Sequence, residues 1–192
     1  MNKLNIVGIG PGAREYLTLN AVETIEKSDV LVGSKRSLEL FDYLDAQMVV
    51  LEPRDIPNTV KKAVSYLDDG LNVSVLSTGD PGFSGMLKTI QRLSPNTKLN
   101  VIPGISSVQL ASAKVEIPWD SANLITIHGG KAPTKDLLDK IDNNVPNIIL
   151  PNRHISELAE YLIDNGFSPE HGITICEKLS YPDEQVVHVT LE

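Results

Sequence analysis

The sequence has few of the residues that build disulfide frameworks, nucleic-acid sites or membrane spans. Only one cysteine, Cys176, occurs among 192 residues, which excludes an internal disulfide and fits a reducing compartment. Acidic side chains outnumber basic ones by 25 to 17, so the basic footprint of a nucleic-acid-binding protein is missing. No apolar run reaches the roughly 18 residues that a membrane-spanning helix needs. We therefore expect a cytoplasmic protein that binds neither nucleic acid nor membranes.

Common catalytic and metal-binding patterns are missing as well. No Cys/His cluster has the spacing of metal ligands, and neither a phosphate-binding P-loop nor a G-x-S-x-G nucleophile motif occurs. A signal peptide is not expected, because Asn5 and the glycines after it interrupt the apolar stretch near the N-terminus. The sequence thus predicts no resident metal, and no residue stands out as an obligatory catalytic base.

What the sequence does contain is a regular alternation of strand-length apolar runs and segments with helical spacing. Leu19, Val22 and Ile25 recur at helical spacing, and Gly70 marks the end of a second such segment. This alternation predicts an α/β fold with largely parallel sheets. The expected strands lie at residues 4–9, 30–32, 48–51, 73–76, 99–102, 124–127, 147–150, 173–176 and 186–189.

The stretch VEIPWDSAN, residues 115–123, separates two blocks with this alternation. It contains Pro118 and Trp119, the only tryptophan. We therefore expect two small α/β domains, residues 1–115 and 116–192, with a ligand-binding cleft between them. The second block is short and stops directly after its last strand-like run, which leaves open whether a final element is missing.

The stretch VGIGPG near the N-terminus raises the question of a bound dinucleotide. Gly8, Gly10 and Ala13 satisfy the G-x-G-x-x-G/A pattern, with Asp29 at the expected distance. However, Pro11 has no N–H to offer a phosphate, and helical spacing begins only near residue 18. Asp29 also precedes the second strand instead of ending it. A different ligand is favoured, with a ligand-free turn as the alternative.

Two further Gly/Pro loops follow predicted strands. STGDPGFSG, residues 77–85, follows the fourth strand, and VIPGISSVQLA, residues 101–111, includes the end of the fifth. The carboxyl ends of parallel strands meet at one edge of a sheet, where ligands of open α/β folds bind. Three such loops together predict a ligand site at this edge.

In these loops the chain resembles the tetrapyrrole (corrin and sirohaem) methylases, which use S-adenosylmethionine. The resemblance is carried by residues 7–12 (VGIGPG), 28–33 (SDVLVG), 78–81 (TGDP) and 103–107 (PGISS). Within the family the chain is most similar to the cobalt-precorrin-7 C5-methyltransferase group, through residues 32–36 (VGSKR), 118–119 (PW) and 127–129 (IHG). The resemblance implies a methyltransferase that acts on a cobalt-corrin intermediate. It also implies a homodimer, and we expect a separate protein to perform the decarboxylating methylation.

The resemblance further implies which residues form the site. Three of these residues also have a structural explanation that stays open. Asp80 could form a simple turn, Ser106 could cap a helix, and His128 could make a structural hydrogen bond. The implied cofactor-binding residues are Gly10, Pro11, Thr78, Gly79, Asp80, Phe83, Ser106, Ser107 and Leu150. The candidates for binding the corrinoid substrate are Lys35, Arg36, His128, Lys131 and Arg153.

Other functions remain alternatives at this point. The chain could be a related methylase that acts at another ring position, or one similar to the diphthine synthases, which methylate a modified histidine on a protein. A non-catalytic module that holds a tetrapyrrole is the alternative from outside the enzymes. Binding of the cofactor separates this last reading from the others.

Overall fold

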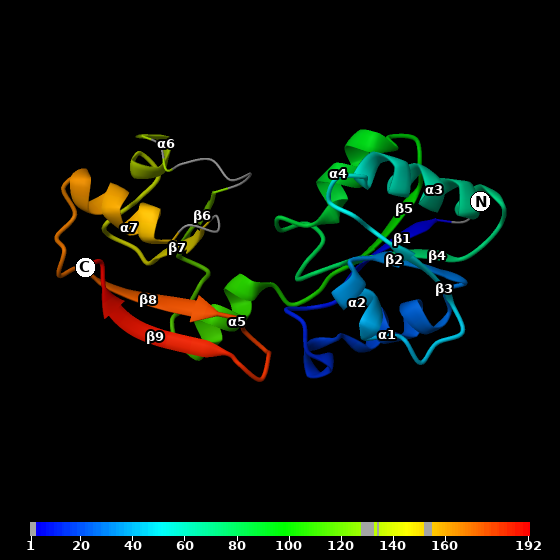
Figure 1. Cartoon of the computed structure of the whole chain (residues 1–192), viewed down its shortest axis with the longest axis horizontal. Helices are drawn as coiled ribbons and strands as arrows, with labels where there is room; N and C mark the ends of the chain where they lie inside the picture. Colours follow the sequence, from blue (N-terminus) through cyan, green and yellow to red (C-terminus); the bar gives the residue numbers. More distant parts are fainter. Residues whose placement is uncertain (1–2, 128–132, 134, 152–154) are drawn as a thin grey trace. The chain divides into compact units, whose positions relative to one another are not determined.

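The computed structural model describes residues 3–127, 133, 135–151 and 155–192. It divides into two compact units, Met1–Ser107 and Val108–Glu192, which are described one at a time. The second unit takes nearly all of helix α5 (Ser107–Lys114), a segment that sequence analysis assigned to the first block. Figure 1 labels the elements of both units.

The first unit is built on a parallel sheet, as the alternation of strands and helices predicts. Its five strands are ordered β3-β2-β4-β1-β5, and every neighbouring pair is parallel. The observed strands agree with the predicted runs to within one residue at each end. They are β1 (Leu4–Gly8), β2 (Val30–Gly33), β3 (Gln47–Val50), β4 (Val73–Ser77) and β5 (Leu99–Ile102).

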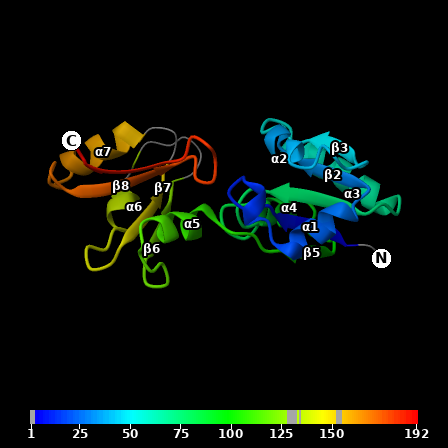
Figure 2. The ribbon, with the colours of Figure 1, turned by 90° about the horizontal axis from the view of Figure 1, so that it is seen from below.

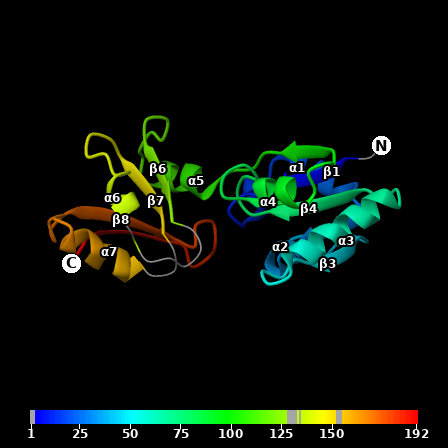
Figure 3. The same cartoon turned by 90° about the horizontal axis from the view of Figure 1, so that it is seen from above.

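Helices cover both faces of this sheet. One face carries α3 and α4 and the other carries α1 and α2 (Figures 1 and 3). The first helix begins where sequence analysis placed it, because the Thr18 hydroxyl accepts a hydrogen bond of 3.1 Å from the Ala21 N–H. The helical elements are the 3-10 helix η1 (Arg14–Tyr16) and the α-helices α1 (Leu19–Glu26), α2 (Lys35–Glu39), α3 (Ile56–Asp68) and α4 (Met86–Leu93).

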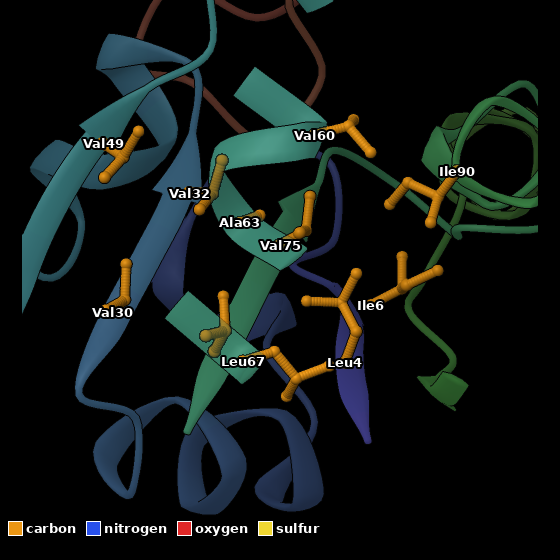
Figure 4. Close-up of a cluster of buried hydrophobic side chains, with 11 residues drawn as sticks. Leu4, Ile6, Val30, Val32, Val49, Val60, Ala63, Leu67, Val75 and Ile90 are labelled. Carbon is orange, nitrogen blue, oxygen red and sulfur yellow. The ribbon is translucent and has the colours of Figure 1, made fainter. Parts of the chain in front are cut away.

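The sheet is buried between these helices. Figure 4 shows side chains of α3 and α4 pointing toward side chains of the strands, for example Val60 and Ile90 over the sheet residues Val75 and Ile6. Every residue of β4 is buried, as a central strand of a covered parallel sheet should be. The buried Ser74 hydroxyl forms a hydrogen bond with the Ser28 hydroxyl, with 2.7 Å between the two Oγ atoms, so it is not left without a partner. The sheet therefore forms a stiff base for the loops at its edges.

The described residues of the second unit form two small sheets. Strands β6 (Asn123–Thr126) and β7 (Asn147–Leu150) are parallel (Figure 2). Strands β8 (Gly172–Glu177) and β9 (Gln185–Thr190) form an antiparallel hairpin (Figure 1). Its helices after α5 are α6 (Lys135–Leu138) and α7 (Ile155–Asp164), which pack on a core around Ile125 and Leu158. The hairpin departs from the largely parallel expectation. Its connection, residues 178–184, is too short for the crossover that parallel strands require.

Candidate functional site

Three loops meet at the carboxyl edge of the first unit's sheet. The first edge loop (residues 9–13) follows β1, the second (78–85) follows β4 and the third (103–106) follows β5. In the strand order β4, β1 and β5 are neighbours, so their carboxyl ends lie side by side. The structure thus brings together the loops that sequence analysis singled out.

Backbone hydrogen bonds join the first edge loop to the second. The Gly79 N–H donates to the Gly10 carbonyl at 2.7 Å, and the Ile9 N–H donates to the Ser77 carbonyl at 3.0 Å. Gly10 and Gly79 have φ angles of +70° and +69°, in the left-handed region that glycine adopts without a steric cost. These two glycines are therefore required by the backbone conformation of the joined loops.

The third edge loop touches the other two backbone to backbone. A Cβ atom added to Gly8 would lie 2.5 Å from the Gly104 nitrogen and 2.8 Å from the Gly79 carbonyl oxygen. A Cβ on Gly104 would likewise meet the Gly79 carbonyl. No side chain fits where the three backbones meet, so only glycine is compatible with this packing.

Asp80 links the second and third edge loops. Its Oδ1 accepts a hydrogen bond from the Gly82 N–H at 2.7 Å, and its Oδ2 accepts one from the Gly104 N–H at 3.1 Å. The first is the turn that the Asp-Pro pair predicts, whereas the second reaches the loop after β5. Because a carboxylate oxygen has two lone pairs, Asp80 keeps acceptor capacity for a ligand while it holds the loops together.

The far end of the second edge loop is fixed to the start of α4. The buried Ser77 hydroxyl accepts a hydrogen bond of 3.2 Å from the Met86 N–H, and the Pro81 carbonyl accepts one of 3.1 Å from the Leu87 N–H. Half-buried Phe83 donates its N–H to the Asp80 carbonyl at 3.2 Å. Ser77 is not among the site residues predicted from the sequence. A serine at the end of a strand, before a Gly/Pro loop and a helix, is the pattern that could have indicated it.

The remaining cofactor candidates lie in different places. Pro11 is buried in the first edge loop, Thr78 is exposed in the second, and Ser106 is buried in the third with its Cα 3.7 Å from the position of a Cβ on Gly79. Ser107 is exposed as the first residue of α5. Leu150 ends β7 in the second unit, where its carbonyl accepts the Ile127 N–H at 2.9 Å.

The substrate candidates are only partly described. Lys35 and Arg36 are the first two residues of α2, both exposed, at the carboxyl end of β2 and thus at the same edge of the sheet as the three loops. The Ser34 hydroxyl caps this helix by accepting the Ser37 N–H at 3.1 Å. The predictions for His128, Lys131 and Arg153 fall outside the described residues.

Two other features of the structure do not belong to this site. A polar hollow of about 280 Å³ lies at the opposite, amino edge of the sheet, and it contains the Lys27–Glu23 ion pair (3.8 Å). Asp29, the acidic residue of the dinucleotide pattern, lies at that edge too and accepts the Asn72 N–H at 2.7 Å. Its place supports the argument against a dinucleotide. The hollow is lined by Asn5, Asn20, Glu23, Thr24, Lys27 and Asn72.

The hydrogen-bonding groups of the site are backbone groups, hydroxyls and the Asp80 carboxylate. Within the described parts of the chain, no three His, Cys, Asp or Glu side chains gather as a metal site, and no helix is long and apolar enough to cross a membrane. The only thiol, Cys176, lies in the second unit, and burial raises its pKa. The small residues at the edge loops leave carbonyl, N–H and hydroxyl groups for a ligand rich in hydrogen-bonding groups.

Comparison with known proteins agrees with this geometry. Residues 3–192 match the sequence model of the Tetrapyrrole (Corrin/Porphyrin) Methylases. A probable cobalt-precorrin-7 C(5)-methyltransferase of Methanocaldococcus jannaschii is 41% identical over 182 residues, which cover 94% of this chain and 86% of that protein.

Solved structures show the same fold. The uroporphyrin-III C-methyltransferase of Thermus thermophilus, complexed with S-adenosylhomocysteine, is 20% identical with a TM-score of 0.77, covering 99% of this chain and 84% of that one. The cobalamin biosynthesis precorrin-6Y methylase of Archaeoglobus fulgidus is 24% identical with a TM-score of 0.74, covering 98% and 90%. These similarities confirm the α/β fold that the sequence predicts.

Proposed function

The chain belongs to the tetrapyrrole (corrin and porphyrin) methylases, and we propose that it transfers a methyl group from S-adenosylmethionine to C5 of the cobalt-corrin intermediate cobalt-precorrin-7. The observation that carries the ring position is the 41% identity to a relative named for this reaction, over 94% of the chain. The family resemblance of the edge loops supports the cofactor.

The three edge loops suit this cofactor, which offers amino, carboxylate and ribose groups but no phosphate. Gly8 and Gly104 keep side chains out of the place where the loops meet, and Asp80 retains lone pairs after its two backbone bonds. The residues that would hold the cofactor are Gly10, Pro11, Thr78, Gly79, Asp80, Phe83, Ser106 and Ser107. Leu150, in the second unit, is a separate candidate from the family resemblance. When bound, the cofactor supplies a methyl group on a sulfonium, which is a good leaving group.

The contribution of the chain to the reaction is then to hold and orient two reactants. Orientation alone can supply several kcal/mol of a barrier, and a sulfonium needs no acid to leave. The peripheral carboxylates of the corrinoid require cations despite the net charge of −8. We assign this role to Lys35 and Arg36 at the start of α2, and to Lys131 and Arg153, with His128 as a further substrate contact.

The proposal extends to the assembly and setting of the enzyme. A homodimer is supported by the family resemblance and by exposed apolar side chains such as Val187 and Val189 on β9. The single cysteine supports action in the reducing cytoplasm. We assign the decarboxylating methylation to a separate protein. Light scattering over a concentration series tests the dimer, and a constant mass of 20.9 kDa would contradict it.

The decisive experiment supplies the purified protein with cobalt-precorrin-7 and S-adenosylmethionine labelled with ¹³C at the methyl group. We expect one labelled methyl in the product by mass spectrometry and its attachment to C5 by NMR. A methyl on another carbon would keep the family and overturn the ring position. Loss of carbon dioxide from the substrate would contradict our assignment of the decarboxylation to a separate protein. Cofactor binding without transfer to any tetrapyrrole would favour a binding module, or a protein substrate as for diphthine synthases.

A further inference from the structure

We infer that Arg14 is a positioning residue, whose guanidinium fixes the first edge loop to the segment that follows α2. The inference deepens the proposed function and rests on it, because it concerns how firmly that loop is held for the cofactor. Arg14 is not among the site residues predicted from the sequence.

The helix η1 lies directly behind the turn at Gly10. A Cβ atom added to Gly10 would be 2.9 Å from the Tyr16 carbonyl oxygen, so the end of η1 is in contact with the loop. The carbonyl of the same Gly10 accepts the Gly79 N–H at 2.7 Å. A shift of η1 would therefore move Gly10 and disturb the pairing of the first and second edge loops.

Burial does little to hold η1 in place. The helix consists of three residues, none of them buried, and no side chain caps its amino end. Leu17, the residue that follows, packs against the apolar cluster around Phe41 and fixes only the end of the helix. Polar and aromatic contacts must supply the rest.

Arg14 makes such contacts with residues far away in the sequence. Its Cζ lies 4.8 Å from the centre of the Tyr43 ring, within the range of a cation–π interaction. Its Nη2 also donates a hydrogen bond to the Leu40 carbonyl. The receiving segment is firm, because Phe41 is only 1% exposed and donates its N–H to the Leu38 carbonyl at 2.9 Å.

This contact connects two parts of the proposed site. Residues 40–43 come directly after α2, the helix that begins with Lys35 and Arg36. Arg14 therefore ties the loop proposed to hold the cofactor to the helix proposed to meet the substrate. Because Arg14 is exposed, its loss should loosen this connection while the fold persists.

The test measures the affinity for S-adenosylhomocysteine by calorimetry in the wild type, Arg14→Ala, Arg14→Lys, Tyr43→Ala and the double variant. We expect Arg14→Ala to weaken binding about three- to tenfold, and Arg14→Lys to recover part of the loss. The double variant should bind about as weakly as Arg14→Ala, because Arg14→Ala already removes the contact with Tyr43. In the free protein, hydrogen exchange at the Gly79 amide should be faster in Arg14→Ala.

The matched control is Lys62→Ala. Lys62 lies over the Tyr66 ring at 5.8 Å on α3, so this variant removes another surface cation–π contact away from the edge loops. We expect it to bind as tightly as the wild type. Wild-type affinity in Arg14→Ala, or an equal loss of affinity in Lys62→Ala, would overturn this inference and leave the proposed function standing. Failure of the wild type itself to bind would overturn the proposed function and the inference with it.

Discussion

The end of β1 and the loop after β5 touch through their backbones, since a Cβ atom on Gly8 would lie 2.5 Å from the nitrogen of Gly104. The Gly79 carbonyl oxygen would be 2.8 Å away from the same atom. The absence of side chains at Gly8 and Gly104 thus allows the three backbones to converge, and each part of this contact can be tested.

Gly8→Ala should be destabilising and should weaken cofactor binding. The added methyl meets backbone atoms of two loops, which cannot rotate away as a side chain would. We expect a loss of about 1–3 kcal/mol in the free energy of unfolding, as for other overpacked sites. Urea unfolding and a titration with S-adenosylhomocysteine measure both effects.

Gly172→Ala is the control for this variant. Gly172 begins β8, has nothing within 4 Å of the position of a Cβ, and its φ is not in the left-handed region. This change should leave unfolding and binding nearly unaltered. Equal behaviour of the two variants would contradict the role that we assign to close backbone approach.

Replacing Asp80 should loosen the second and third edge loops before any ligand is present. Asp80→Asn leaves one oxygen to accept one of the two N–H groups, and Asp80→Ala leaves none. Each bond to the carboxylate is worth about 1.5–3 kcal/mol, so affinity should fall in the order wild type, Asn, Ala. Hydrogen exchange at the Gly104 amide should accelerate in the ligand-free variants.

Asp68→Asn, an exposed change on α3, serves as the control for Asp80. An Asp80→Ala protein that loses affinity while the Gly104 amide exchanges at the wild-type rate would assign Asp80 to ligand contact alone. That result would remove its role in joining the loops.

Lys35→Gln should raise the KM for the corrinoid and leave the affinity for the cofactor unchanged. Exposed charge pairs contribute little each, so an effect of about two- to fivefold is expected, and it should shrink at high salt. Lys61→Gln, an exposed change on α3, is the matched control and should have no effect. A similar rise of KM in both variants would indicate only long-range charge and would contradict a local contact.

The Lys114–Glu184 ion pair predicts a pH-dependent stability of the second unit. The hydrogen bond from Lys114 (2.5 Å) and one from the Ser180 N–H lower the pKa of Glu184. The contribution to stability is therefore complete above the unfolded value of about 4.3 and is lost as the pH falls through the lower folded value. Glu184→Gln should be less stable than the wild type at neutral pH.

The difference between the two proteins should disappear in acid, as measured by urea unfolding at several pH values. Asp183→Asn, which removes the exposed partner of Lys178, is the control for loss of a charge in the same hairpin turn. If the difference in the free energy of unfolding between wild type and Glu184→Gln persists below the folded and unfolded pKa values of Glu184, the charge of Glu184 is not its cause.

The strands and the edge loops could be predicted because short-range pattern determines them. Residues 99–102 and 147–150 are strands at the predicted bounds, since apolar runs bounded by turn residues permit little else. The bond between Asp80 and Gly104 could not be predicted. It depends on the order and register of β4, β1 and β5, which no local pattern determines. The contact of Arg14 with Tyr43 depends on tertiary packing in the same way.

The place of β1 between β4 and β5 has a consequence for synthesis. Asn5 pairs with Ser74, and Leu4 pairs with Leu99, so the first strand made waits for partners encoded much later. At translation rates of about 5–20 residues per second, that wait is on the order of ten seconds. Non-local pairing also slows folding after release, because a long chain must close before the contacts form. The nascent chain therefore exposes the apolar side chains of β1 to chaperones and to aggregation until the sheet is completed around it.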